Sequence, residues 1–364
     1  ENELSNDALI FQYGPVTGSD QWKMEMAKFL SQAYGGAVLQ DNLILTCGAH
    51  HGFHLVLSTL LDLNGVVFID EITYTNSLGI CRQFSTMQIV PVAFDLSTGV
   101  DFDDLQCKVK SRKFTPCEGK PFWGVYFTMS VFHNPTGVTY SPDLCMKLIE
   151  LARQEDMLIV SDDASNLLSY NFPEKPPKRL FAYDNYENDN YLGHVVSTSS
   201  FSKLLGQGIR LGWMECPPRI MEIFNNSAIL YGTGSFNHFT SHLITTFLRE
   251  GLCQKQYESI LVKYRERLNL VEDYLKNHLP KEIKVKHPRG GLFLWIEFPL
   301  GFPAEAFEKY LIEKHQMFVL NGSYFSVNGD KFQNCIRFVC TYYDLPTLKV
   351  ASEIFCESYK QFSH

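Results

Sequence analysis

The sequence predicts an α/β fold, in which helices flank a mostly parallel sheet and a smaller α+β domain completes the chain. Short apolar runs of the length of buried strands recur along the sequence. Segments whose apolar residues fall at helical spacing separate these runs. The chain has 364 residues, which is long enough for two domains and a large core.

Composition narrows the class of protein. Hydrophobic residues make up 45% of the chain and charged residues 20%, as in folded globular proteins. The formal net charge of −8 and the lack of a block rich in Lys and Arg argue against a nucleic-acid partner. No apolar run reaches the length of a membrane span and no signal peptide is visible, so we expect no membrane partner. The ten cysteines include no CxxC pair, which favours free thiols and a cytoplasmic location.

The N-terminal part is predicted to contain a loop, a helix and a strand–turn–helix unit. The loop Phe11–Gly18 is rich in glycine and proline and precedes a helix over Gln21–Tyr34, which Gly35 and Gly36 end. An apolar strand then begins at Leu43 and leads through a tight turn to a helix over His54–Leu61.

The turn at Gly48, Ala49 and His50 is a candidate anion site. A glycine before a helix leaves backbone N–H groups free at the positive end of the helix dipole, which suits a phosphate. The chain has neither a GxGxxG nor a GxxxxGK[ST] run, so a nucleotide-binding function for this turn is the weaker alternative. His50 and His51 lack a third ligand at a sensible spacing, so we expect no metal.

The rest of the chain alternates predicted strands and helices. A polar, basic stretch at Cys107–Pro121 is expected to be a surface loop, and Ser141-Pro142 is expected to start the helix that follows. Expected strands are Val66–Tyr74, Met87–Val92, Phe122–Met129 and Met157–Ser165, with further strands within Pro288–Trp295 and Asn334–Phe338; expected helices are Asp143–Gln154, Ser235–Glu250 and Tyr257–Leu279, the last linking the two domains.

One stretch, Val195–Trp213, points to a specific chemistry. It begins as an apolar strand, passes through small hydroxyl residues and presents Lys203, with Arg210 seven positions later. Hydroxyls such as Ser200 and a guanidinium suit a phosphate, and a lysine amine beside a bound phosphate ester is placed to form a Schiff base with an aldehyde. Pyridoxal phosphate (PLP) combines these two groups.

These motifs resemble the PLP-lysine signature of fold-type I, class I/II aminotransferases. The resemblance is carried by Ser200-Phe201-Ser202-Lys203 and by Gln207–Trp213, and it extends from about Phe11 to about Cys340. The subgroup that it resembles most contains the 2-aminoadipate and kynurenine aminotransferases, although proline or serine is usual at Gln207. It implies a large PLP-binding domain over residues 37–265 and a small domain from residues 1–36 and 266–364.

The resemblance also implies roles for individual residues. Asp162 matches the aspartate bonded to the pyridine nitrogen, where a carboxylate keeps the ring protonated as an electron sink. Tyr74 matches the aromatic residue that stacks on the pyridine ring, and Tyr13 the tyrosine that reaches the partner subunit's cofactor phosphate. Asn134, within His133-Asn134-Pro135-Thr136-Gly137, matches the asparagine that bonds the pyridine O3′ and contacts substrate. The phosphate is expected to be held by Gly48, Ala49, His50, Ser200, Ser202 and Arg210.

Three features concern the substrate. Arg337 matches the strand arginine whose guanidinium binds the α-carboxylate of the substrate through two parallel hydrogen bonds. Ser165 stands where the family has a tyrosine that donates to O3′, and this departure puts ordinary transamination rates in doubt. In the family a longer arm precedes the Gln-Tyr-Gly-Pro stretch and lies near the substrate; we expect it to be absent or removed here.

The function that follows is PLP-dependent transfer of the amino group of an α-amino acid, aromatic or long-chain acidic, to a 2-oxo acid such as 2-oxoglutarate. Lys203 would hold PLP as a Schiff base and move the proton from Cα to C4′. A PLP lyase or decarboxylase on the same scaffold, a relative with low transaminase activity and a catalytically silent binding protein are the alternatives. The resemblance further implies a homodimer with shared active sites.

Overall fold

The computed structural model describes residues 8–171, 173–184, 187, 191–232 and 234–362. Its largest element is a seven-stranded sheet in the order β1-β9-β8-β7-β6-β2-β3, in which β9 runs against its neighbours β1 and β8 and the remaining neighbours are parallel. The strands are β1 (Leu43–Thr46), β2 (Leu61–Asp70), β3 (Gln88–Val92), β6 (Phe122–Thr128), β7 (Leu158–Asp162), β8 (Val195–Ser200) and β9 (Gly212–Glu215). The mostly parallel, helix-flanked sheet predicted from the sequence is therefore confirmed.

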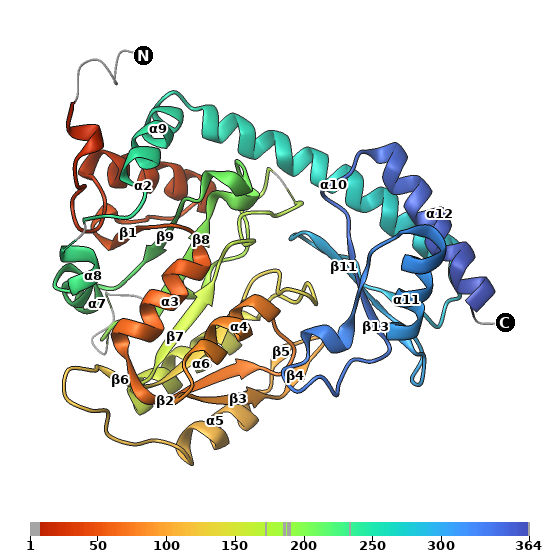
Figure 1. The fold of residues 1–364 in the computed structure, drawn as a ribbon, viewed down its shortest axis with the longest axis horizontal. Coiled ribbons are helices and arrows are strands. Elements are labelled where there is room, and N and C mark those ends of the chain that lie inside the picture. Colours follow the sequence, from red (N-terminus) through yellow and green to blue (C-terminus); the bar gives the residue numbers. More distant parts are fainter. Residues whose placement is uncertain (1–7, 172, 185–186, 188–190, 233, 363–364) are drawn as a thin grey trace.

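Helices cover both faces of this sheet, as Figure 1 shows. Side chains alternate along each central strand, so that Val125 and Phe127 of β6 join one apolar core and Tyr126 joins the other. The first core includes residues of α3 (Ala49–Leu60), α4 (Thr75–Gln83) and α7 (Pro218–Asn225); the second includes residues of α5 (Phe102–Lys110) and α6 (Pro142–Glu155). Burial on both faces explains why these strands are apolar throughout.

A four-stranded antiparallel sheet, ordered β10-β11-β13-β12, forms the second part of the fold. In Figure 1 it lies on the right beside two helices, and the long α10 runs toward it from the N-terminal side of the molecule. These elements are β10 (Lys284–Val285), β11 (Phe293–Glu297), β12 (Leu320–Asn321), β13 (Cys335–Val339), α10 (Leu252–His278), α11 (Ala304–His315) and α12 (Leu345–Phe362). The remaining elements are α2 (Asp20–Tyr34), α8 (Ala228–Tyr231), α9 (His238–Arg249) and the hairpin of β4 (Phe94–Asp95) and β5 (Gly99–Val100).

Helix ends follow their capping residues. Gly35 ends α2 with a left-handed φ of 72°, as predicted, and Ser141 Oγ accepts a 3.2 Å hydrogen bond from the Leu144 N–H at the start of α6. The helix after the Gly48 turn begins at Ala49, so the expected start at His54 was wrong. Gly48 itself is the N-cap, with a φ of 116°, and this single residue makes the whole turn.

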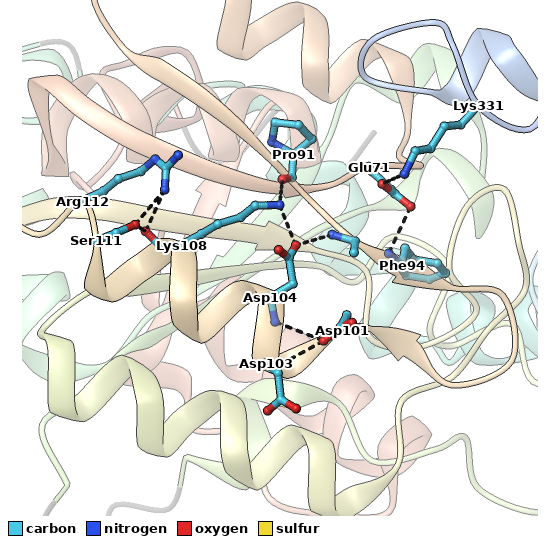
Figure 2. A network of polar contacts seen from close by, with 11 residues as sticks. Glu71, Pro91, Phe94, Asp101, Asp103, Asp104, Lys108, Ser111, Arg112 and Lys331 are labelled. Atoms are coloured by element: carbon cyan, nitrogen blue, oxygen red, sulfur yellow. Dashed lines mark hydrogen bonds and ion pairs between the residues drawn. The ribbon is translucent and has the colours of Figure 1, made fainter.

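The expected loop at Cys107–Pro121 was wrong in its first part, because α5 extends to Lys110. Asp101 accepts hydrogen bonds from the Asp103 and Asp104 N–H groups and caps this helix (Figure 2). Lys108 and Lys110 occupy the last turn, where positive charge is favourable. The basic composition that indicated a loop thus belongs to a helix C-terminus.

The N-terminal helix packs against the seven-stranded sheet. Residues 1–36 were assigned to the small domain, yet Trp22, Met26 and Leu30 of α2 share an apolar core with Leu43 and Leu45 of the seven-stranded sheet. We therefore propose that α2 belongs to the large domain. Among the described residues, no helix combines the length and the apolar character needed to cross a bilayer.

Candidate active site

All the residues singled out from the sequence except Tyr13 come together around one cavity of about 400 Å³. The cavity lies where β7 and β8 end, as expected for the ligand site of a parallel sheet, and β11 and β13 of the small sheet form its other wall. The predicted residues that line it are Gly48, Ala49, His50, Tyr74, Asn134, Asp162, Ser200, Ser202, Lys203, Arg210 and Arg337.

Gly48, Ser200 and Arg210 form a cradle at the start of α3. A Cβ placed on Gly48 would lie 3.4 Å from Arg210 Nη2 and 3.5 Å from Ser200 Oγ, so a side chain there would occupy the space between the two polar groups. Arg210 adopts a left-handed φ of 52°, and its guanidinium donates to the carbonyl oxygens of Cys47 (3.1 Å) and Gln207 (3.0 Å). Backbone amides, a hydroxyl and a guanidinium thus converge, which is the chemistry of a phosphate site.

Two further features stabilise the cradle formed by Gly48, Ser200 and Arg210. Ser200 Oγ accepts a 3.1 Å hydrogen bond from the Ser202 N–H and donates to Ser202 Oγ at 2.8 Å. A Cβ on Gly212 would lie 2.5 Å from the Gly48 Cα and 2.4 Å from the Ser199 carbonyl oxygen. The strand that returns after Arg210 therefore passes so close to the Gly48 turn that only glycine fits.

Asp162 ends β7 and faces the cavity opposite His50 and Lys203. Its Oδ1 accepts a 3.1 Å hydrogen bond from the Ala164 N–H. Burial raises the pKa of this carboxyl, and the hydrogen bond and the two neighbouring bases oppose that shift. A cationic ring nitrogen would compensate the buried carboxylate directly. His50 stacks on Tyr74, with ring centroids 5.4 Å apart and an angle of 18° between the planes.

Lys203 follows β8 in a short 3-10 turn, Phe201–Lys203. Burial lowers the pKa of its amine, the positive charge of Arg337 lowers it further, and Asp162 opposes both effects. A lowered pKa raises the fraction of neutral amine, which is the nucleophilic form.

Arg337 on β13 and Asn134 from the loop after β6 meet across the cavity. Arg337 Nη1 donates to Asn134 Oδ1 at 2.9 Å, and its guanidinium carbon lies 4.0 Å from the centroid of Phe293 and 4.6 Å from that of Phe325. Burial lowers the pKa of Arg337 to about 10. Its buried Nε has no hydrogen-bond partner among the described residues. The guanidinium lines the cavity, and its planar fork of donors suits an anionic ligand.

Tyr13 and Ser165 complete the comparison with the sequence. Tyr13 is 82% exposed and does not line the cavity, whereas Ser165 does line it. Sequence reasoning missed the apolar lining and the contact of Asn237 Nδ2 with the Ile209 carbonyl oxygen beside the cradle. Leu292 and Phe293 lay within a predicted strand, but nothing in that pattern indicated that they face a ligand. The unpredicted lining residues are Met129, Val131, Phe132, Ala164, Gln207, Leu292 and Phe293.

The cavity therefore fits a phosphorylated pyridine aldehyde. The cradle left by Gly48 takes the phosphate, Asp162 faces a ring nitrogen, Tyr74 offers a flat ring, and Lys203 presents an amine. The guanidinium of Arg337 lines the same cavity and suits a carboxylate. A phosphate, a carboxylate and an aldehyde would thus each have a suitable binding group within a single cavity.

Comparison with known proteins agrees with this chemistry. The family model described as aminotransferase class I and II matches residues 1–353. Aromatic-amino-acid aminotransferase 1 of Thermococcus litoralis is 26% identical, over 92% of this chain and 76% of that protein. The 2-aminoadipate transaminase of Thermus thermophilus is 24% identical, over 90% and 76% respectively. The crystal structure of kynurenine aminotransferase from Pyrococcus horikoshii, in complex with PMP, superposes with a TM-score of 0.84 at 27% identity, covering 99% of this chain and 85% of that one.

Proposed function

This chain belongs to the class I and II aminotransferases and is a PLP-dependent enzyme of that family, and we propose the substrate class and residue roles that follow from its cavity. When bound, the cofactor supplies an electron sink that weakens the bonds at the substrate Cα. The residues of this chain bind the two anionic groups and move the proton.

Lys203 is the residue that we propose for covalent attachment of the cofactor and for proton transfer at Cα. The observation that supports this role most is its position: Lys203 lines the cavity together with Arg337 and Asp162, and partial burial lowers the pKa of its amine. Once the substrate amine replaces it, the freed Lys203 amine acts as the base at Cα. Asp162 keeps a ring nitrogen protonated, Tyr74 stacks on the ring, and Asn134 donates to O3′.

The substrate is proposed to be an α-amino acid with a long apolar or aromatic side chain. Arg337 binds the α-carboxylate, because it lines the cavity and its guanidinium presents a planar fork of donors that matches a carboxylate. The walls beside it are apolar and include Val131, Phe132 and Phe293. Burial of an apolar side chain against such walls favours binding by about 25 cal/mol per Å².

A homodimer is proposed as the working form, with cytoplasmic location. Phe239, Leu243 and Phe247 lie along one side of α9 and are 40%, 38% and 46% exposed, and the Phe11 ring stacks on Phe239 at 5.4 Å. Tyr13 projects from the same N-terminal segment. An apolar stripe of this kind supports pairing with a second copy, in which Tyr13 would reach the partner's phosphate cradle. Free thiols at all ten cysteines support a reducing compartment.

The test begins with the covalent linkage. Purified protein is loaded with PLP, reduced with borohydride, digested and mapped, and the adduct is expected on Lys203; a Lys203→Ala variant of unchanged circular dichroism is the control. Loss of labelling in the variant supports the assignment, and labelling of another lysine refutes it.

Amino acids are then screened for release of the matching oxo acid with transfer of nitrogen to an added 2-oxo acid. Ammonia or CO₂ as the product would instead indicate a lyase or a decarboxylase.

A further inference from the structure

A buried carboxylate lies behind the cavity, outside the residues assigned above. Asp70 ends β2 and its side chain is fully buried. It accepts hydrogen bonds from the hydroxyls of Tyr126 (2.6 Å), Thr128 (2.8 Å) and Tyr140 (3.3 Å). Burial, followed by the Asp70 charge, raises the pKa of both tyrosines well above the ordinary value, so both stay neutral donors. A full set of donors makes this a preorganised negative charge.

His133, next to Asn134 in the chain, points its ring at this carboxylate. His133 Nε2 lies 3.5 Å from Asp70 Oδ2, and His133 Nδ1 lies 2.9 Å from Thr136 Oγ1. The Thr136 hydroxyl also accepts a hydrogen bond from the Val138 N–H at 3.4 Å. Nε2 is buried and makes no hydrogen bond with the described residues, and Asp70 is the carboxylate within ion-pair range of it.

A side chain from a neighbouring element packs against the His133 ring. The Phe94 ring lies over His133, with centroids 4.6 Å apart. Phe94 is itself fixed, because its N–H donates to Glu71 at 3.3 Å, and Glu71 pairs with Lys331 of the small domain at 2.5 Å (Figure 2). The Glu71 contacts drawn in Figure 2 therefore hold the backbone of Phe94, whose ring packs against His133.

The backbone of His133 closes the loop that carries Asn134. The His133 N–H donates to the Val138 carbonyl oxygen at 2.8 Å, and the Gly137 N–H donates to the His133 carbonyl oxygen at 2.7 Å. Asn134 stands in this loop and holds Arg337 through the 2.9 Å bond described above. A continuous set of contacts thus runs from Asp70 to the arginine proposed to bind the substrate carboxylate.

We propose that His133 is a positioning residue for substrate binding, which acts through the Asp70–His133–Thr136 contacts to hold Asn134 and thereby orient Arg337. This inference rests on the proposed role of Arg337 as the carboxylate site. It assigns no contact between His133 and either the cofactor or the substrate. A guanidinium that is free to rotate would bind a carboxylate less well, because bidentate pairing needs a fixed plane.

The test compares His133→Leu, which removes both ring nitrogens, with His133→Gln, which keeps a donor close to the position of Nε2. Binding of 3-phenylpropionate to the PLP-loaded protein is measured by calorimetry. The Kd is expected to rise about tenfold in His133→Leu and to recover toward the wild-type value in His133→Gln. KM for the best amino acid is expected to rise with kcat changed less than about twofold, the pattern of lost ground-state positioning.

Two further variants distinguish a loss of substrate positioning from a general loss of stability. Arg153→Met removes a 2.6 Å ion pair with Asp184 away from the cavity and should leave the Kd unchanged. Thr136→Val nearly preserves the side-chain volume and removes the hydroxyl partner of His133 Nδ1. It should raise the Kd as His133→Leu does, and it replaces that variant in the test if His133→Leu does not fold. An unchanged Kd in a folded His133→Leu or Thr136→Val variant overturns the proposal, as does an equal loss in Arg153→Met. If no amino acid is transaminated but 3-phenylpropionate binding still depends on Arg337 and His133, the proposed reaction fails while the positioning role stands.

Discussion

Arg337 and Asn134 are joined by a 2.9 Å hydrogen bond that links the small antiparallel sheet to the loop after β6. The bond occupies Nη1 and leaves the buried Nε of Arg337 without a partner among the described residues. The two Phe rings beside the guanidinium restrict it further. These contacts fix the plane of a guanidinium that lines the cavity, so a carboxylate bound there would meet an oriented fork of donors.

Arg337→Lys is expected to raise KM for the amino acid about 10- to 100-fold, because an ammonium group keeps the charge but loses the planar fork and the stacking on Phe293. Steady-state kinetics and the Kd of 3-phenylpropionate measure the effect. Affinity for PLP should stay within about twofold of wild type, since Arg337 does not belong to the cradle. A KM that does not move would exclude Arg337 as the carboxylate site.

Gly48→Ala is expected to weaken PLP binding by about tenfold or more. The new methyl group would lie 3.4 Å from Arg210 Nη2 in the space left for the phosphate, and the φ of 116° is strained for alanine. Fluorescence titration of the cofactor-free protein with PLP measures the Kd. Gly36→Ala is the matched control, because its Cβ would meet no atom within 4 Å. Equal effects of the two substitutions would contradict the cradle.

Ser165→Tyr is expected to lower the pH at which the visible absorbance of the PLP-loaded protein changes. A phenol that donates to O3′ would stabilise its deprotonated form. Absorbance titration from acid to alkaline pH gives this value directly. Ser165→Phe adds the same ring without the hydroxyl and should leave the value near that of wild type; a matching shift in Ser165→Phe would assign the effect to volume.

Asp163→Asn is expected to become more stable relative to wild type as pH rises. Burial raises the pKa of the Asp163 carboxyl from 3.8 to about 7, so between these values the folded chain binds a proton that the unfolded chain has released. Stability contributed by this group therefore falls from about pH 4 to pH 7. From pH 5 to pH 8 the variant should gain about 2–3 kcal/mol over wild type in urea unfolding. Asp41→Asn, at an exposed site, should show no such trend.

Arg179→Met is expected to destabilise the protein by about 3–5 kcal/mol, because it leaves the buried Glu215 carboxylate unpaired. Arg179 donates to Glu215 at 3.0 Å through Nε and at 2.7 Å and 2.5 Å through Nη2. Urea unfolding at a fixed PLP concentration measures the loss. The double variant Arg179→Met with Glu215→Leu should recover most of the lost stability. A double variant as unstable as Arg179→Met alone would show that lost packing, and not the unpaired charge, causes the destabilisation.

Most of the large sheet was predictable, because strands buried on both faces are apolar throughout and helices show their own spacing. The helix after Ser141 carries a cap and a proline in the chain itself, and α6 begins there. The start of α3 and the length of α5 were mispredicted, since a single glycine with positive φ and a basic last turn gave weak local signals.

The sequence alone pointed to PLP chemistry, because Ser200, Lys203 and Arg210 stand close together in one motif and the resemblance to the aminotransferase family adds Asp162. Only the tertiary structure decided which residues stand beside them. The apolar wall at Phe293, the bond from Arg337 to Asn134 and the burial of His133 against Asp70 join segments far apart in the chain. Such contacts depend on how the two sheets and their loops pack, and no short-range pattern carries that information.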